Sequence, residues 1–177
     1  MLSNQSASEY KSSSDYNVYY AYDKNDNITQ VKVNNGLTST YTYNDANLLT
    51  SLVHKNSSGT LGTYSYTYTI DGNMSKKVES GTTTSYTYDG SNRLLKESAV
   101  RNGVTTNMTY AYDTAGNRSK LTVTGSQNYI TSYTYDKNNI LLRESKVNSG
   151  SSYADLTIYS YDNTYYTWRK SYEILFR

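Results

Sequence analysis

The stretch YAYDTAGNR, residues 110–118, decides the fold, because each part of it has a local structural meaning. Side chains alternate between the two faces of a β-strand, so Tyr110 and Tyr112 project from the same face. The carboxylate of Asp113 suits a turn in which it accepts a hydrogen bond from the backbone N–H two residues on. Gly116 suits a left-handed backbone position within that turn. The stretch therefore predicts the end of a strand followed by a tight turn.

The same pattern occurs seven times along the chain, beginning at Tyr20, Tyr41, Tyr68, Tyr86, Tyr110, Tyr133 and Tyr159. We place its second aromatic slot at Tyr22, Tyr43, Ile70, Tyr88, Tyr112, Tyr135 and Tyr161. The turn then closes on Gly116 or on an asparagine suited to the left-handed region, namely Asn27, Asn47, Asn92 or Asn139. The residues with a predicted structural role in the repeat are Tyr20, Tyr22, Asp23, Asn27, Tyr41, Tyr43, Asn47, Tyr68, Asp71, Asn73, Tyr86, Tyr88, Asp89, Asn92, Tyr110, Tyr112, Asp113, Gly116, Asn117, Tyr133, Tyr135, Asp136, Asn139, Tyr159, Tyr161 and Asp162.

A second set of turn signals lies about halfway between successive copies. Asn-Gly between apolar runs is a strong hairpin signal, and it occurs at Asn102-Gly103. The other members of the set are Asn34-Asn35-Gly36, Ser57-Ser58-Gly59, Ser80-Gly81, Gly125-Ser126 and Ser149-Gly150. The alternation of the two turn types predicts an all-β fold, an antiparallel β-meander of hairpins without helices.

The composition indicates a sheet that is held together by tyrosine. The chain has 23 tyrosines among 177 residues, so the rings must form much of any core. Each ring keeps a hydroxyl group that needs a partner, and we expect the abundant Thr, Ser and Asn side chains to supply it. Proline is absent, which fits a continuous sheet of paired strands. Cysteine is also absent, which excludes disulfides and thiolate chemistry.

The repeats divide the chain into three predicted segments. Residues 1–15 are rich in Ser and Asn and are predicted to be disordered, whereas residues 16–163 hold the repeat sheet. Residues 164–177 form a C-terminal tail or a final strand. The N-terminus has neither the cationic start nor the apolar core of a signal peptide, and no apolar run is long enough for a membrane helix.

The YxYDxxGNR stretch at Tyr110 to Arg118, followed by YxYDxxN at Tyr133 to Asn139, resembles the YD repeats of bacterial Rhs and wall-associated proteins and of the animal teneurins. The resemblance covers nearly all of residues 16–163. It implies a twisted, spiralling sheet, here a partial shell. In that family the shell often encapsulates a toxic C-terminal domain, and some members are linked to carbohydrate or the cell wall. The resemblance thus implies a fragment of a shell that encapsulates or displays another domain, secreted or at the cell surface as part of a larger bacterial protein.

Catalysis is not predicted. His54 is the only histidine, and we interpret it as an ordinary strand residue near a turn. Glycosidases need two carboxyl groups that flank one bond, whereas an Asp in every repeat is explained by the turn in every repeat. A calcium loop starting at Asp23 would need Gly at its sixth position and Glu at its twelfth, where Ile28 and Asn34 stand. We therefore expect no enzyme activity, no catalytic or metal-binding residue and no cofactor.

Two kinds of partner are consistent with the sequence. A fragment of a sheet has open edges, so we expect further YD repeats or self-association there. The alternative function is a carbohydrate-binding module that holds cell-wall glycan on exposed rows of tyrosine. The net charge of +2 is too small to predict bulk attraction to nucleic acid, and we expect no nucleic-acid partner.

Overall fold

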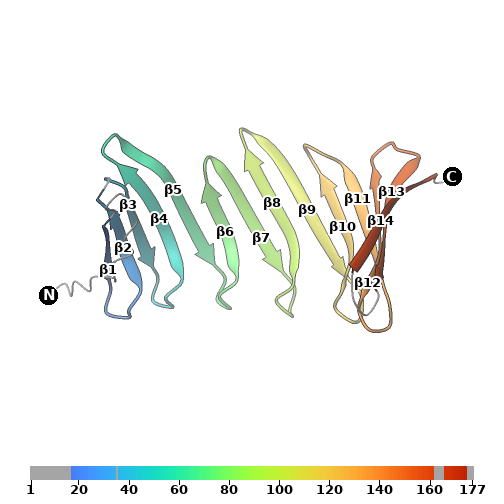
Figure 1. Ribbon diagram of the computed structural model, residues 1–177, viewed down its shortest axis with the longest axis horizontal. Helices are drawn as coiled ribbons and strands as arrows, with labels where there is room; N and C mark the ends of the chain where they lie inside the picture. Colours follow the sequence, from blue (N-terminus) through green and yellow to red (C-terminus); the bar gives the residue numbers. More distant parts are fainter. Residues whose placement is uncertain (1–16, 35, 162–165, 175–177) are drawn as a thin grey trace. The chain divides into compact units, whose positions relative to one another are not determined.

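The computed structural model describes residues 17–34 and 36–161, together with the backbone of residues 166–174 (Figure 1). The chain separates into two compact units, residues 1–83 and 84–177. The predicted disordered segment 1–15 lies outside the described residues, and so does Asp162. The proposed division at residues 16–163 and 164–177 stays a prediction, with a strand at Tyr166–Ile174 in the last segment.

The first unit is an antiparallel meander in which each strand pairs with the next along the chain. Its strands are β1 (Val18–Tyr22), β2 (Ile28–Val33), β3 (Thr38–Tyr43), β4 (Leu49–Asn56), β5 (Gly59–Tyr68) and β6 (Met74–Glu79). The strand β7 (Thr82–Tyr88) contains the division between the units.

The second unit continues the same pattern of antiparallel neighbours. Its strands are β8 (Leu94–Arg101), β9 (Val104–Tyr112), β10 (Arg118–Thr124), β11 (Tyr129–Tyr135), β12 (Leu141–Asn148), β13 (Tyr153–Tyr161) and β14 (Tyr166–Ile174). The described residues contain no helix. The predicted all-β antiparallel meander is therefore confirmed.

The two tyrosines of each Y-x-Y lie on the same face, which we call the tyrosine face; the opposite face is the back face. In β11 the alternation is clear, since Thr131 is buried, Tyr133 and Tyr135 are half-buried, and Ser132 and Thr134 between them are exposed. Burial is limited, because each unit is one layer of strands. Among the described residues no large side chain is fully buried, and the buried hydrophobic residues are Val123, Ala154 and Leu156.

Candidate functional site

The turn after each Y-x-Y has one geometry in the six copies described. It contains five residues, and the N–H of the first donates to the C=O of the fifth at 2.7–3.0 Å. The N–H of the fourth residue donates to the C=O of the first at 2.9–3.3 Å. Figure 1 shows the turns after β1, β3 and β5 at the same end of the first unit. The five-residue turns are 23–27, 44–48, 69–73, 89–93, 113–117 and 136–140.

A side chain at the first position closes the turn. In Asp113 the Oδ1 atom accepts from the N–H of Ala115 at 2.9 Å and from the N–H of Asn117 at 2.8 Å. The equivalent oxygen of Asp23, Asn44, Asp89 and Asp136 accepts the same two bonds, all between 2.8 and 3.0 Å. These bonds satisfy two backbone donors that the tight loop leaves without ladder partners.

The fourth position of each turn has a positive φ, the conformation of a three-residue hairpin loop that ends in a bulge. Asn47, Asn92 and Asn139 occupy it with φ near 60°, and Gly116 occupies it with φ of 89°. The prediction that Asn27 is left-handed is wrong, because the residue with positive φ in that turn is Asp26. Asn27 is the fifth residue of this turn, as Asn117 is in its own turn, and its amide bonds Asp23.

The third copy is offset by two residues from its predicted alignment. The strand β5 ends at Tyr68, and Thr69 stands at the first turn position, where its Oγ1 accepts from the N–H of Asn73 at 3.1 Å. The prediction that Ile70 fills the second aromatic slot is wrong, because Ile70 is fully exposed within the turn. Tyr68 fills that slot, and Asp71 stands at the third position of the turn rather than the first.

The second tyrosine of the Y-x-Y makes a bond that the sequence did not indicate. Its hydroxyl donates to a backbone carbonyl of the preceding strand, directly after the preceding turn. We call this bond the tyrosine clamp. The described clamps are Tyr43 to Ile28, Tyr68 to Leu49, Tyr112 to Leu94, Tyr135 to Arg118 and Tyr161 to Leu141, at 2.6–3.0 Å. Backbone carbonyls, and not the predicted Thr, Ser and Asn side chains, are therefore the partners of these hydroxyls.

The register explains why a carbonyl is available. The ladder between β4 and β5 stops at the pair Ser51 and Ser65, so the backbone at Leu49 has no partner in β5. The ladder between β10 and β11 likewise stops at Lys120 and Ser132, beyond Arg118. A carbonyl left unpaired beside a sheet costs free energy, and the tyrosine hydroxyl satisfies it. Each clamp thus joins one hairpin to the hairpin before it.

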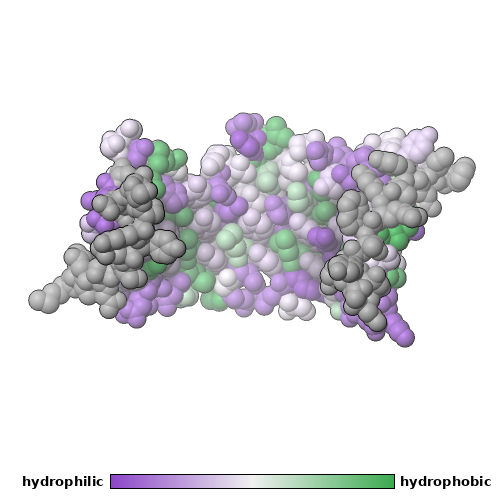
Figure 2. Space-filling view, viewed as in Figure 1, coloured by the Kyte–Doolittle hydropathy of each residue, from purple (hydrophilic) through white to green (hydrophobic). Residues whose placement is uncertain are grey.

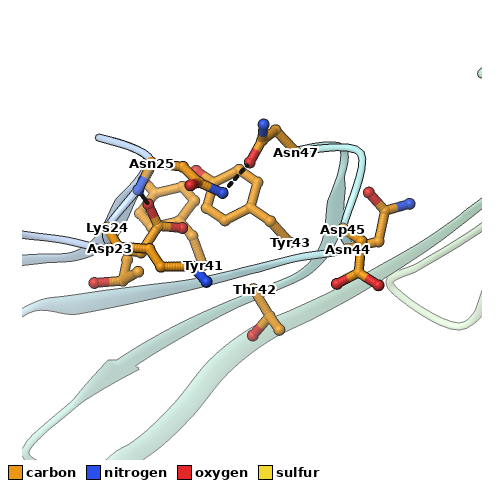
Figure 3. A pocket seen from close by; sticks show the side chains of 10 residues that line it. Asp23, Lys24, Asn25, Tyr41, Thr42, Tyr43, Asn44, Asp45 and Asn47 are labelled. Carbon is orange, nitrogen blue, oxygen red and sulfur yellow. Dashed lines mark hydrogen bonds between the residues drawn. The ribbon is translucent and has the colours of Figure 1, made fainter.

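Amide groups also link neighbouring turns. In the first unit the Nδ2 atoms of Asn25 and Asn27 both donate to Oδ1 of Asn47, at 2.9 Å. In the second unit Nδ2 of Asn117 donates to Oδ1 of Asn139 at 2.8 Å. Figure 3 shows Asn25 reaching Asn47 across a polar cavity of about 490 Å³ between the first two turns. Hydrophilic side chains gather along this edge of the first unit in Figure 2.

The environment of the turns shifts two sets of pKa values. The Asn27 amide that bonds Asp23 lowers the pKa of that carboxyl group. The backbone N–H and the guanidinium of Arg93 lower the pKa of Asp89, which Nε of Arg93 meets at 2.7 Å. Burial raises the pKa of the clamp residues Tyr43, Tyr68 and Tyr135.

Cations cover part of the tyrosine face. The guanidinium of Arg93 lies 4.6 Å from the ring centre of Tyr112, and that of Arg118 lies 4.4 Å from the ring centre of Tyr133. Such contacts stabilise a partly exposed ring by about 0.5–1 kcal/mol. The rings therefore pack against neighbouring repeats rather than standing as a free aromatic row.

His54 belongs to the packing of the first unit. Its Nδ1 lies 2.8 Å from Oγ of Ser39, and its ring meets the edge of Tyr64 with 5.6 Å between ring centres. Within the described residues no group of three His, Cys, Asp or Glu side chains is placed to hold a metal ion. Some of the predicted repeat residues thus lie at the five-residue turns, and five of the predicted tyrosines form clamps, while the expected lack of enzyme activity stays a prediction.

Part of the chain is similar in sequence to a known protein family. Residues 22–60 match the RHS Repeat family model, and they contain the first two five-residue turns and the clamp residue Tyr43. This segment is similar to an RHS repeat. The resemblance of the chain to the YD-repeat family is therefore confirmed. No match was found among curated protein sequences. No helix in the described part of the chain is long and apolar enough to cross a membrane.

Solved structures share the fold of this chain. The crystal structure of TcdB2-TccC3-Cdc42 matches with a TM-score of 0.73 and 16% identity over 90% of this chain. The crystal structure of TcdB2-TccC3-TEV matches with a TM-score of 0.69 and 16% identity over 88%. A variant of the Photorhabdus luminescens Tc holotoxin pore matches with a TM-score of 0.55 and 13% identity over 82%. This chain spans only 9–10% of the length of those chains.

Proposed function

We propose that this chain is a structural module, a length of RHS-repeat sheet that forms part of a larger wall around another polypeptide. The observation that carries this proposal is the repetition of one turn and one clamp. The Tyr112 and Tyr135 clamps, for example, join successive hairpins of the second unit in the same way. The polar groups of the repeat are thus used to attach each hairpin to its neighbour.

A sheet built in this way favours further repeats at its ends. In such arrays the stability is approximately a sum of terms for each repeat and for each contact between neighbours. Within the described residues β1 has a strand partner on one side only, and an open edge of this kind pairs readily with another strand. Much longer chains contain this fold, as the coverage of about one tenth shows. We propose further repeats as the partner and a secreted or cell-surface location for the whole protein.

The wall that such repeats form would enclose another polypeptide. In the family that the sequence resembles, the repeats close into a shell, and this chain supplies one part of such a wall. Carbohydrate binding stays an alternative prediction, which no contact described above favours. The two functions differ in what a tyrosine does: a clamp tyrosine holds the sheet, whereas a glycan-binding tyrosine must be exposed.

Duplication of one repeat tests the module directly. The variant inserts a second copy of residues 113–135 between Tyr135 and Asp136, which supplies one more turn, two strands and one more clamp. We expect a higher midpoint of thermal unfolding, because the added repeat brings its own contacts with both neighbours. A control with a Gly-Ser insert of equal length at the same point should lower the midpoint. Equal midpoints for the two variants would contradict the proposal.

Glycan binding is tested separately by sedimentation with purified peptidoglycan. We expect the chain to stay in the supernatant. If it sediments, and if Tyr19→Ala or Tyr153→Ala abolishes this, the carbohydrate alternative replaces the structural role. These two rings are chosen because each is 56% exposed, so their loss leaves the clamps in place.

A further inference from the structure

The acidic residues of strands β1–β13 all lie on the tyrosine face. Glu97 is in register with Met108, Glu144 with Tyr133, and Asp155 with Lys146, all of which belong to that face. Glu79 pairs with Tyr64 in the first unit. All four carboxylate side chains are half-buried. Among the described strand residues with described side chains, the back face therefore has no carboxylate.

The back face carries cations at a repeated position. Lys76 pairs with Thr67, Lys120 with Ala111, and Arg143 with Thr134. Each of these partners is the middle residue of a Y-x-Y, so each cation points away from the tyrosines. The fourth such cation is Lys96, which pairs with Thr109. All four side chains are exposed, and each is the third residue after a five-residue turn.

In the second unit these cations form a row beside apolar side chains. Lys96, Lys120 and Arg143 lie on β8, β10 and β12, so successive cations are about 10 Å apart across the strands and two residues apart along them. Ile130 on the same face is 40% exposed and is in register with Thr122 and Val147. These three residues line a cavity of about 340 Å³ together with the end turn at Ser149–Ser151.

We propose that the back face of the second unit is a docking surface for an acidic polypeptide segment that carries an aliphatic anchor residue. The carboxylates would meet Lys96, Lys120 and Arg143, and the anchor would enter the cavity beside Ile130. Complementary charge sets the register and the rate of such an encounter. Because no carboxylate lies on the back face of strands β8–β13, these cations provide this complementarity although the net charge of the chain is only +2. The inference does not depend on the proposed enclosing role.

Other polyanions fit this face less well. Nucleic acids and sugars use aromatic rings as stacking platforms, and the tyrosines of residues 84–161 all lie on the other face. Anionic membranes attract dense clusters of Lys and Arg, whereas here single cations alternate with Thr, Ser and aliphatic side chains. Cations mixed with hydroxyl groups and a partly exposed aliphatic pocket are typical of a protein interface.

Fluorescence anisotropy with a labelled peptide of three Glu-Glu-Ile-Gly-Ser repeats tests the proposal. We expect saturable binding to the full chain that weakens when salt screens the charges. The double reversal K96E/K120E should weaken binding about tenfold, since it replaces two attractions by two repulsions. Ile130→Ser should weaken it roughly fivefold through loss of an apolar contact. A peptide with Gln in place of Glu should not bind.

The matched control is K24E/K137E, which makes the same change of charge on exposed lysines of the five-residue turns. Circular dichroism confirms that each variant is folded. Equal affinity of K96E/K120E and K24E/K137E for the peptide would overturn the proposal. Tighter binding to single-stranded DNA or to vesicles containing phosphatidylserine, measured in the same buffer, would also overturn it by assigning the face to a different polyanion.

Discussion

The two ends of the strands are built on different principles. At one end, every described turn has five residues, a left-handed fourth position and a side-chain oxygen that closes the loop. At the other end, the turns differ from one another. Ser80-Gly81 and Asn102-Gly103 are two-residue turns with positive φ at both positions, whereas Gly59 follows Ser57-Ser58 and Gly125 precedes a loop closed by Asn128.

This difference separates two sources of order. The five-residue turns and clamps rely on side-chain hydrogen bonds. Substitution of the Tyr or the Asp should therefore lower the free energy of unfolding by a similar amount in whichever repeat it is made. The opposite turns rely on backbone conformation, so an altered glycine should have a cost that depends on its own surroundings.

Alkaline pH is expected to have the largest effect, because it acts on the clamps of Tyr43, Tyr68 and Tyr135 together. Burial raises the pKa of Tyr43, Tyr68 and Tyr135 above the ordinary value of 10.0, so the folded state holds these protons more tightly than the unfolded state. Their contribution to stability is complete below pH 10 and is lost as pH rises through the folded-state values. Urea midpoints measured from about pH 8 to about pH 11 should fall steeply above pH 10. A flat profile would show that the clamps contribute little.

Gly125→Ala is expected to be the most damaging single substitution. Its φ is +115°, and an added Cβ would fall on the carbonyl oxygen of Thr105. We expect a loss of more than about 3 kcal/mol in the free energy of unfolding, seen by urea titration, or failure to fold. Gly103→Ala is the control, since φ is +76° but the space around it is open, and about 1 kcal/mol should be lost. Equal losses would contradict the view that surroundings decide the cost.

Removal of one clamp hydroxyl is expected to be intermediate. Tyr68→Phe leaves the carbonyl of Leu49 without its 2.6 Å bond and should cost about 1–2 kcal/mol. Tyr112→Phe in the second unit should cost a similar amount, and the two losses should add because the sites share no partner. Tyr153→Phe, on a ring that is 56% exposed, is the control with little expected change. Unequal costs at the two clamps would show that the repeats are not equivalent.

A gain in stability, smaller than these losses, is expected from Thr69→Asp. The Thr69 hydroxyl accepts one bond, from the N–H of Asn73. An aspartate there can accept bonds from the backbone and from the Asn73 amide, as Asp113 does with Asn117. We expect the free energy of unfolding to rise by about 0.5 kcal/mol. Thr42→Asp, at the exposed middle position of a Y-x-Y and opposite the uncharged Ser51, is the control and should not stabilise the fold.

The sequence predicted the features that depend on local chemistry. Alternation in Y-x-Y and the Asp after it were enough to predict the hairpins, because strand faces and turn bonds involve residues close in the chain. The same reasoning failed at Ile70 and Asp71, where Thr69 replaces the expected Asp and the DG dipeptide resembles a turn start. Counting back from Gly72 as the left-handed residue would have placed Tyr68 correctly.

Contacts between hairpins could not be predicted from the sequence of a single repeat. The clamp partner of Tyr135 is a backbone carbonyl 17 residues earlier, and no side-chain pattern marks it. The cations of the back face had a visible signal, since Lys76, Lys96, Lys120 and Arg143 recur at one offset from the turns. That signal acquires meaning only once the register shows which face each cation occupies.

Because the clamps are identical, they permit incorrect pairing of hairpins during folding. A hairpin that docks one repeat too early or too late along the chain meets the same carbonyl and the same turn, so the wrong pairing is penalised only by the loop that must bridge it. The varied turns at the opposite end, with their different lengths and glycines, then determine which pairing the chain can close without strain. The differences among these turns therefore favour the native order of hairpins that would otherwise be interchangeable.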